Sequence, residues 1–313
     1  MKDYIRPERY SYEEFPTSTA QSKYEVIKVE ADLSWRYPFI QMDEVYATKD
    51  DKDLHIHVIM PTPNFLFPSQ ATFPLIVYIQ GSGFQKQNMG DHIAHLAEFA
   101  MRGYVIAMVE YRHTPEGTFP QQILDTKTAI RYLYKNKEKY HIEDERVILW
   151  GDSSGGHTVV MTAVTEELQE FSEEDNASQP LNILGVVDLY GPTVICRMNC
   201  QPSMGDHISA ESREGQLFGG VPVLENLDQV EKANPLNYID SSKTLPPFLI
   251  MHGDKDRLVP FEQSVLLYDA LKDAGKEAAF YQLVGADHTM DAFFSPEMTE
   301  IVHEFMQRLL TKC

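Results

Sequence analysis

A run of small residues between an apolar stretch and a helical pattern is the feature that most constrains this fold. Residues 150–156 are Trp-Gly-Asp-Ser-Ser-Gly-Gly, and the β-prone residues 147–149 precede them. A strand that stops here and a helix that begins near Ser154 force Ser153 into a sharp turn with its hydroxyl pushed outward. Glycines two positions before and after this serine let the turn close without a Cβ clash. The pattern is typical of a nucleophile elbow.

The bare pattern also fits other glycine-containing turns. A Gly-x-Ser-x-Gly run arises by chance in roughly one in ten chains of this length. A glycine-rich helix start or a phosphate-binding loop would have the same sequence. The elbow interpretation therefore depends on whether partners for the serine lie elsewhere in the chain.

Strand and helix patterns alternate along the chain, which favours an α/β fold. Apolar runs predict strands at residues 25–30, 54–60, 75–80, 104–110, 147–150, 184–189, 247–252 and 279–284. Helical periodicity predicts helices at 92–101, 123–134, 157–168, 261–274 and 296–310. This alternation implies a mostly parallel sheet with crossover helices on both faces. No convincing helix separates the first two predicted strands, so we expect them to form an antiparallel N-terminal edge.

The 313 residues fit one domain with two additions. Since large α/β folds routinely exceed about 200 residues as one unit, we expect a single domain over 1–313, with an N-terminal extension at 1–35. The alternation lapses over 192–244, where we expect a lid or cap insertion; an elaborate surface connection is the alternative. The aromatic residues of the extension leave three roles open: a strap across its own domain, a cover for the cleft, or an arm that grips a second subunit of a homo-oligomer. These residues are Tyr4, Tyr10, Tyr12 and Phe15.

Composition disfavours several classes of partner. Asp and Glu outnumber Lys and Arg 47 to 27, and the formal charge of −20 repels phosphate backbones and anionic membrane surfaces. We therefore expect no nucleic-acid partner. The first 16 residues lack the apolar core of a secretory signal, and no apolar run is long enough to span a bilayer, so we expect a soluble cytoplasmic protein. Cys196, Cys200 and Cys313 cannot all pair, and the first two lack the second ligand pair of a zinc site, so we expect reduced thiols and no metal.

Two loops after later strands supply the partners that a serine nucleophile needs. A serine hydroxyl needs a general base, usually histidine, and the histidine needs a carboxylate to fix its tautomer. Asp256 follows the strand predicted at 247–252, and His288 follows the strand predicted at 279–284. The order Ser153, Asp256, His288, with each residue at the carboxyl end of a predicted strand, is the chain order of α/β-hydrolase triads.

Other candidate residues have simpler explanations. Asp254 is the main competitor for the acid, although its place beside a glycine is equally typical of a turn. The spacing of His92 and His95 would suit a metal, but a solvated helix face explains it more simply. His157, in the first turn after the serine, is expected to have a packing role.

A glycine-containing loop is placed to stabilise a developing negative charge. Residues 80–84, Gln-Gly-Ser-Gly-Phe, end the strand predicted at 75–80. Backbone N–H groups of this loop and of Ser154 are expected to converge on the carbonyl oxygen of a tetrahedral intermediate. A plain glycine turn at a strand end is the alternative.

Together these motifs resemble the esterase and lipase branch of the α/β-hydrolases, in particular the hormone-sensitive-lipase-like and feruloyl or acetyl esterase-like (BD-FAE-like) groups. The resemblance runs from about residue 54 to residue 310 and includes the loop at 80–84, the elbow, Tyr190-Gly191-Pro192 and the block 252–260. It implies an α/β-hydrolase fold with Ser153 as nucleophile, Asp256 as acid and His288 as base, and with the amides of Ser82, Gly83 and Ser154 as the oxyanion hole. One departure is that the family usually shows a histidine followed by three glycines, where this chain has Gln80 and, at the middle glycine, Ser82.

We therefore expect a cofactor-free serine carboxylic-ester hydrolase that works through an acyl-enzyme. The resemblance implies small-molecule substrates that are short-chain acyl or aryl esters, with acetyl and feruloyl or other hydroxycinnamoyl esters of plant carbohydrates as candidates. Two alternatives stay open. One is an amide hydrolase, such as an arylformamidase or a peptidase, with the same triad, and the other is a ligand-binding protein on a hydrolase scaffold. The complete set of three residues disfavours the second.

Overall fold

The computed structural model describes residues 6–33, 36–62, 71–172 and 178–311, and the chain divides into two units, 1–35 and 36–313. In the first unit, the prediction of a strand at 25–30 is wrong, because the structure has irregular backbone there. Val26, Ile27 and Val29 are exposed, so this segment has neither ladder hydrogen bonds nor a buried face to hold it as a strand. Tyr4 and Cys313 lie outside the described residues.

The second unit is built on one eight-stranded sheet. Its order is β1 (Phe39–Lys49), β2 (Lys52–Met60), β4 (Val105–Val109), β3 (Phe73–Ile79), β5 (Ile142–Asp152), β6 (Ile183–Leu189), β7 (Phe248–Gly253) and β8 (Ala278–Leu283). The strands from β4 to β8 in this order are parallel, while β1–β2 and β2–β4 are antiparallel. The expected mostly parallel sheet with an antiparallel edge is confirmed, although β1 takes the edge position that we assigned to 25–30.

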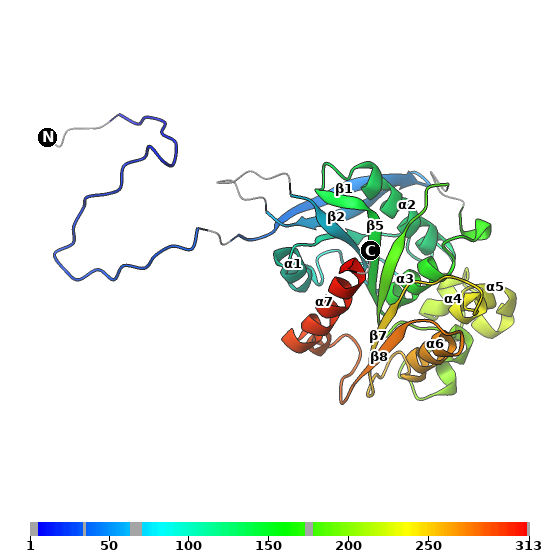
Figure 1. Ribbon diagram of the computed structural model, residues 1–313. Helices are drawn as coiled ribbons and strands as arrows, with labels where there is room; N and C mark the ends of the chain where they lie inside the picture. The colour runs from blue at the N-terminus through cyan, green and yellow to red at the C-terminus, as the bar shows by residue number, and fades with distance from the viewer. Residues whose placement is uncertain (1–5, 34–35, 63–70, 173–177, 312–313) are drawn as a thin grey trace. The chain divides into compact units, whose positions relative to one another are not determined.

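Helices cover both faces of this sheet (Figure 1). One face packs against α1 (Ile93–Met101) and α7 (Pro296–Thr311), and the other against α2 (Gln121–Lys135), α3 (Ser154–Val164) and α6 (Glu262–Asp273). Successive strand side chains point to opposite faces, so Val77 lies in the core under α2 and α3 while Tyr78 lies in the core under α1 and α7. None of the helices in the described part of the chain is long and apolar enough to cross a membrane.

The region between β6 and β7 forms a layer of short helices beside α6 (Figure 1). It contains α4 (Arg213–Leu217), α5 (Leu227–Lys232) and three short 3₁₀ helices, Ile195–Cys200, Val223–Glu225 and Pro235–Tyr238. This layer has a small apolar core of its own, to which Met198, Leu217 and Val230 belong. Phe84 joins the same core from the loop after β3, so the layer packs on the predicted oxyanion loop.

Candidate active site

The turn between β5 and α3 holds Ser153 in a strained conformation. Its φ of 51° and ψ of −124° lie outside the common regions for a residue with a Cβ. The turn is close-packed, since a Cβ on Gly155 would lie 1.9 Å from the carbonyl oxygen of Ile79, and one on Gly151 would lie 2.4 Å from that of Gly155. Glycine is therefore required at both positions for β5 to turn into α3 and present the serine hydroxyl.

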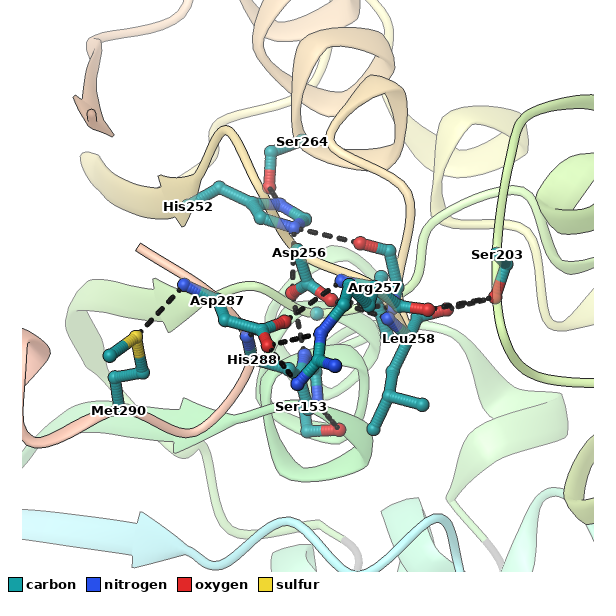
Figure 2. A network of polar contacts seen from close by, with 12 residues as sticks. Ser153, Ser203, His252, Asp256, Arg257, Leu258, Ser264, Asp287, His288 and Met290 are labelled. Carbon is teal, nitrogen blue, oxygen red and sulfur yellow. Dashed lines mark hydrogen bonds and ion pairs between the residues drawn. The ribbon is translucent and has the colours of Figure 1, made fainter. Parts of the chain in front are cut away.

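The structure brings Ser153, His288 and Asp256 into one hydrogen-bonded chain (Figure 2). His288 Nε2 lies 3.0 Å from Ser153 Oγ, and His288 Nδ1 lies 2.6 Å from Asp256 Oδ2. The acid follows β7 and the histidine follows β8, so both reach the serine from the carboxyl ends of parallel strands. The competing Asp254 instead accepts hydrogen bonds from the Gly285 amide and the Gln282 side chain, at 2.7 and 2.9 Å.

Four N–H groups surround the Asp256 carboxylate. Oδ1 accepts from the amides of Leu258 and Val259 at 2.8 and 2.9 Å, and Oδ2 accepts from His288 and from His252 Nε2 at 3.1 Å. Burial alone would raise the pKa of Asp256, but the hydrogen bonds from His252 and His288 outweigh it and hold this pKa well below its usual range. The carboxylate is therefore ionised at neutral pH and orients His288 with Nε2 toward the serine.

His252 is a member of this site for which the sequence analysis predicts no role. It is fully buried at the end of β7, and its Nε2 lies 3.1 Å from Asp256 Oδ2 and 3.0 Å from the Val259 carbonyl oxygen (Figure 2). Both neighbours of Nε2 are acceptors, so this nitrogen carries the proton. The Ser264 hydroxyl lies 2.7 Å from Nδ1 and donates a hydrogen bond to it. The signal in the sequence is a polar residue closing an otherwise apolar strand, four residues before the acid.

The predicted oxyanion residues differ in whether their backbone amides already donate a hydrogen bond within the protein. The Ser82 N–H donates to Ser154 Oγ at 2.9 Å, so the structure gives this amide a partner within the protein. Within the described residues, the amides of Gly83 and Ser154 donate to no protein acceptor. The side chain of Ser82 is also engaged, since its Oγ donates to the Gln85 carbonyl oxygen at 2.6 Å. Two of the three predicted amides are thus available to a ligand.

Two buried carboxylates lie beneath the serine. Asp152 Oδ1 accepts hydrogen bonds from the Tyr78 hydroxyl and the Gly81 amide, at 2.6 and 2.9 Å, which ties the loop after β3 to the elbow. Asp188 Oδ1 accepts from the Gly191 amide at 3.1 Å, while its Oδ2 is buried and has no hydrogen-bond partner. Burial raises the pKa of Asp188 to about 7.

A cavity of about 410 Å³ opens beside the serine and is lined mainly by polar groups. Its lining includes Ser153, Ser154 and His288, the loop at 83–85, and residues 205–207 and 211–214 of the layer between β6 and β7. This volume accommodates a small-molecule ligand. The region predicted as a cap therefore contributes a large part of the cavity lining.

The three other histidines considered in the sequence, His157, His92 and His95, are explained by packing. His157 is buried, contacts the Ala233 carbonyl oxygen at 2.8 Å, and has its pKa lowered to about 4 by burial. The rings of His92 and His95 both stack on Phe294, with centroids 4.9 and 4.7 Å away. The described residues contain no cluster of three or more His, Cys, Asp or Glu side chains that could hold a metal ion.

The sheet order, the crossover helices and a serine on a strained turn after β5 define an α/β-hydrolase. The BD-FAE family model matches residues 65–271, more than half of the chain. This protein therefore belongs to the BD-FAE family, as the sequence resemblance indicated.

Individual relatives carry names of esterases. A solved structure described as a truncated form of a carbohydrate esterase from gut microbiota is 26% identical, with a TM-score of 0.77 over 91% of this chain and 100% of that chain. A bifunctional GH43-CE protein of Bacteroides eggerthii is also 26% identical, with a TM-score of 0.73 over 86% of this chain and 38% of that chain. The probable carboxylic ester hydrolase LipM of Mycobacterium tuberculosis is 26% identical over 71% of this chain and 50% of its own length. This chain spans about half the length of the curated relatives it matches.

Proposed function

We propose that this protein is a serine carboxylic-ester hydrolase in which Ser153 is the nucleophile, His288 the general base and Asp256 the acid. The observation that carries the proposal is the hydrogen-bonded chain from Ser153 Oγ through His288 to Asp256, with links of 3.0 and 2.6 Å. The esterase names of the relatives support the same reaction class.

The geometry supports a two-step reaction. Ser153 Oγ attacks the ester carbonyl carbon while His288 Nε2 takes its proton, and the amides of Gly83 and Ser154 donate to the resulting oxyanion. The imidazolium gives that proton to the leaving alcohol as the C–O bond breaks, which leaves an acyl-Ser153 ester. Water then loses a proton to His288 and attacks the acyl group, and the acid and the free serine are released. The ionised Asp256 stabilises the imidazolium in both steps.

We propose short-chain acyl or aryl esters as substrates, with acetyl and feruloyl esters of carbohydrates as the first candidates. The polar lining of the cavity suits an alcohol rich in hydroxyl groups. The carbohydrate esterase among the structural neighbours supports the same choice. We also propose that 192–244 acts as a cap that walls this cavity, with 1–35 an extension of a single catalytic domain.

The test compares the wild type with Ser153→Ala on 4-nitrophenyl acetate and on its amide analogue, 4-nitroacetanilide. We expect ester hydrolysis by the wild type, and a loss of about 10⁴-fold to 10⁶-fold in kcat in the variant with an unchanged unfolding temperature. The matched control is Ser242→Ala, because Ser242 is exposed and, within the described residues, forms side-chain hydrogen bonds with the nearby Asp240 alone. Near-normal hydrolysis by Ser153→Ala would overturn the assignment, and faster turnover of the anilide would favour an amide hydrolase.

A further inference from the structure

Arg213 lies over the predicted oxyanion loop. A Cβ on Gly83 would lie 2.3 Å from Arg213 Cδ and 2.9 Å from its Nε, so the arginine side chain crosses directly above this loop. It lines the same cavity as Ser153 and His288. Its guanidinium is therefore placed beside the position where an ester would react.

The guanidinium of Arg213 has no ion pair or hydrogen bond with any described residue. The other arginines of the described second unit all have a partner; they are Arg36, Arg102, Arg112, Arg131, Arg146, Arg197, Arg257 and Arg308. The chain has 20 more acidic than basic residues, so partners are abundant. Arg213, whose side chain is exposed, is thus the one arginine of the described second unit without a partner in the protein, and its guanidinium is free to bind a ligand in the cavity.

Two acidic residues of the cavity have compensating contacts of their own. Asp206 Oδ1 accepts hydrogen bonds from the amides of Ile208 and Ser209, at 3.0 and 3.1 Å. Glu214 Oε1 lies 3.1 Å from His207 Nδ1, in a pair that is almost fully buried, and its Oε2 is buried without a hydrogen-bond partner. The contacts of these two carboxylates are therefore with groups other than Arg213.

Glu211 is the remaining acidic residue of the cavity, and its effect opposes that of Arg213. It is exposed and forms no ion pair with the arginine in the described structure. Because exposed charges are well screened, Glu211 weakens but does not cancel the attraction of an anion to the guanidinium.

The backbone that carries Arg213 is firmly held. Ser212 caps α4 by accepting a hydrogen bond from the Gly215 amide at 2.9 Å, and its own hydroxyl donates to the Ser209 carbonyl oxygen at 2.6 Å. A Cβ on Gly215 would lie 2.1 Å from that carbonyl oxygen, so this turn has no room to shift. The guanidinium is thus a positively charged group on a well-held turn, and it lines the same cavity as the serine.

We propose that Arg213 binds a carboxylate carried by the ester substrate, so that the enzyme prefers esters with a free acid group near the reacting carbonyl. A guanidinium offers parallel N–H donors that match the two oxygens of a carboxylate. This inference rests on the proposed ester hydrolase function and adds a substrate class to it. Arg213 is then a specificity-determining residue.

The test uses two pairs of esters that differ in charge. Ethyl hydrogen succinate is compared with ethyl pentanoate for a carboxylate on the acyl side, and 4-acetoxybenzoate with its methyl ester for one on the alcohol side. We expect the wild type to favour the anionic member of at least one pair. In Arg213→Gln, the ratio of kcat/KM for anionic over neutral ester should fall by about 10-fold to 100-fold, with an intermediate ratio in Arg213→Lys.

A charge-matched control is Arg197→Gln, because Arg197 pairs with Glu262 and does not line the cavity. This variant should keep the wild-type ratio. A wild type without preference for the anionic esters, or an Arg213→Gln ratio equal to that of the wild type, would overturn the inference.

A binding measurement separates this inference from the proposed function. Titration calorimetry with succinate and with 4-hydroxybenzoate reports carboxylate binding even when no ester is turned over. We expect weaker binding by Arg213→Gln than by the wild type and by Arg197→Gln. If neither anion binds the wild type, the inference is wrong, whereas a failure to hydrolyse any of the esters, anionic or neutral, would count against the ester hydrolase itself.

Discussion

The buried carboxyl group of Asp188 makes the stability of this protein depend on pH in a direction opposite to that of most carboxylates. Its Oδ1 accepts a hydrogen bond from the Gly191 amide, its Oδ2 has no partner, and burial raises its pKa from 3.8 to about 7. Below about pH 4 the group is protonated in both the folded and the unfolded chain. Between about pH 4 and pH 7 only the folded chain keeps the proton, so the free energy of unfolding falls as the pH rises and then levels off above pH 7.

The size of this effect follows from the two pKa values. The difference between about 7 and 3.8, at about 1.4 kcal/mol per pH unit, amounts to about 4 kcal/mol in total. About 3 kcal/mol of that falls between pH 4.5 and pH 8. The substitution Asp188→Asn removes the titration, so the stability of the variant relative to the wild type should increase by about 3 kcal/mol across this range. The new amide N–H costs about 1–3 kcal/mol at every pH, because it lacks an acceptor.

The assay is urea denaturation of both proteins at pH 4.5 and pH 8. We expect Asp188→Asn to be less stable than the wild type, or equal to it, at pH 4.5 and more stable at pH 8. Asp254→Asn is the control, since hydrogen bonds from the Gly285 amide and Gln282 lower the pKa of this exposed group. This group titrates below the assayed range, so the stability difference between Asp254→Asn and the wild type should be nearly the same at pH 4.5 and pH 8. A stability difference between Asp188→Asn and the wild type that stays constant with pH would refute the reasoning.

Two further substitutions test the elbow and the acid. His252→Phe removes the N–H group that donates to Asp256 at 3.1 Å, so kcat/KM should fall by about 10-fold to 100-fold. His252→Gln keeps an N–H donor and should therefore recover part of the lost kcat/KM. Equal losses in the two variants, with equal unfolding temperatures, would argue against the hydrogen bond. Gly155→Ala places a Cβ 1.9 Å from the carbonyl oxygen of Ile79 and should lower the free energy of unfolding by about 3 kcal/mol or more in chemical denaturation. Gly90→Ala, where the nearest atom is 3.5 Å away, should change it by less than about 0.5 kcal/mol, and a Gly155→Ala variant as stable as this control would contradict the close packing of the turn.

The sequence predicted those parts of the site that depend on the order of strands. Ser153, Asp256 and His288 each follow a run of apolar residues, and the carboxyl ends of parallel strands meet at one edge of a sheet. Their approach to one another therefore follows from topology. Strand β1 was missed because Asp43 and Glu44 interrupt its alternation at a register shift.

Features that depend on the direction of side chains could not be predicted from the sequence. The Ser82 amide is occupied by the hydroxyl of Ser154, which only the packing of the loop on α3 decides. The position of Arg213 depends on how the layer between β6 and β7 folds back over the sheet, and that region has no periodic pattern. His252 lies near the end of β7, and its hydrogen bond to Asp256 depends on how the loop that follows this strand folds back.

The most direct test of the Ser153 and His288 assignment is covalent labelling with diisopropyl fluorophosphate, followed by peptide mapping in a mass spectrometer. The hydrogen bond between His288 Nε2 and Ser153 Oγ predicts one adduct, on Ser153, formed with loss of fluoride and in step with the loss of ester hydrolysis. In His288→Ala the labelling rate should fall by about 10³-fold or more. Full inhibition with an unmodified Ser153, or labelling at the wild-type rate without His288, would contradict the assignment.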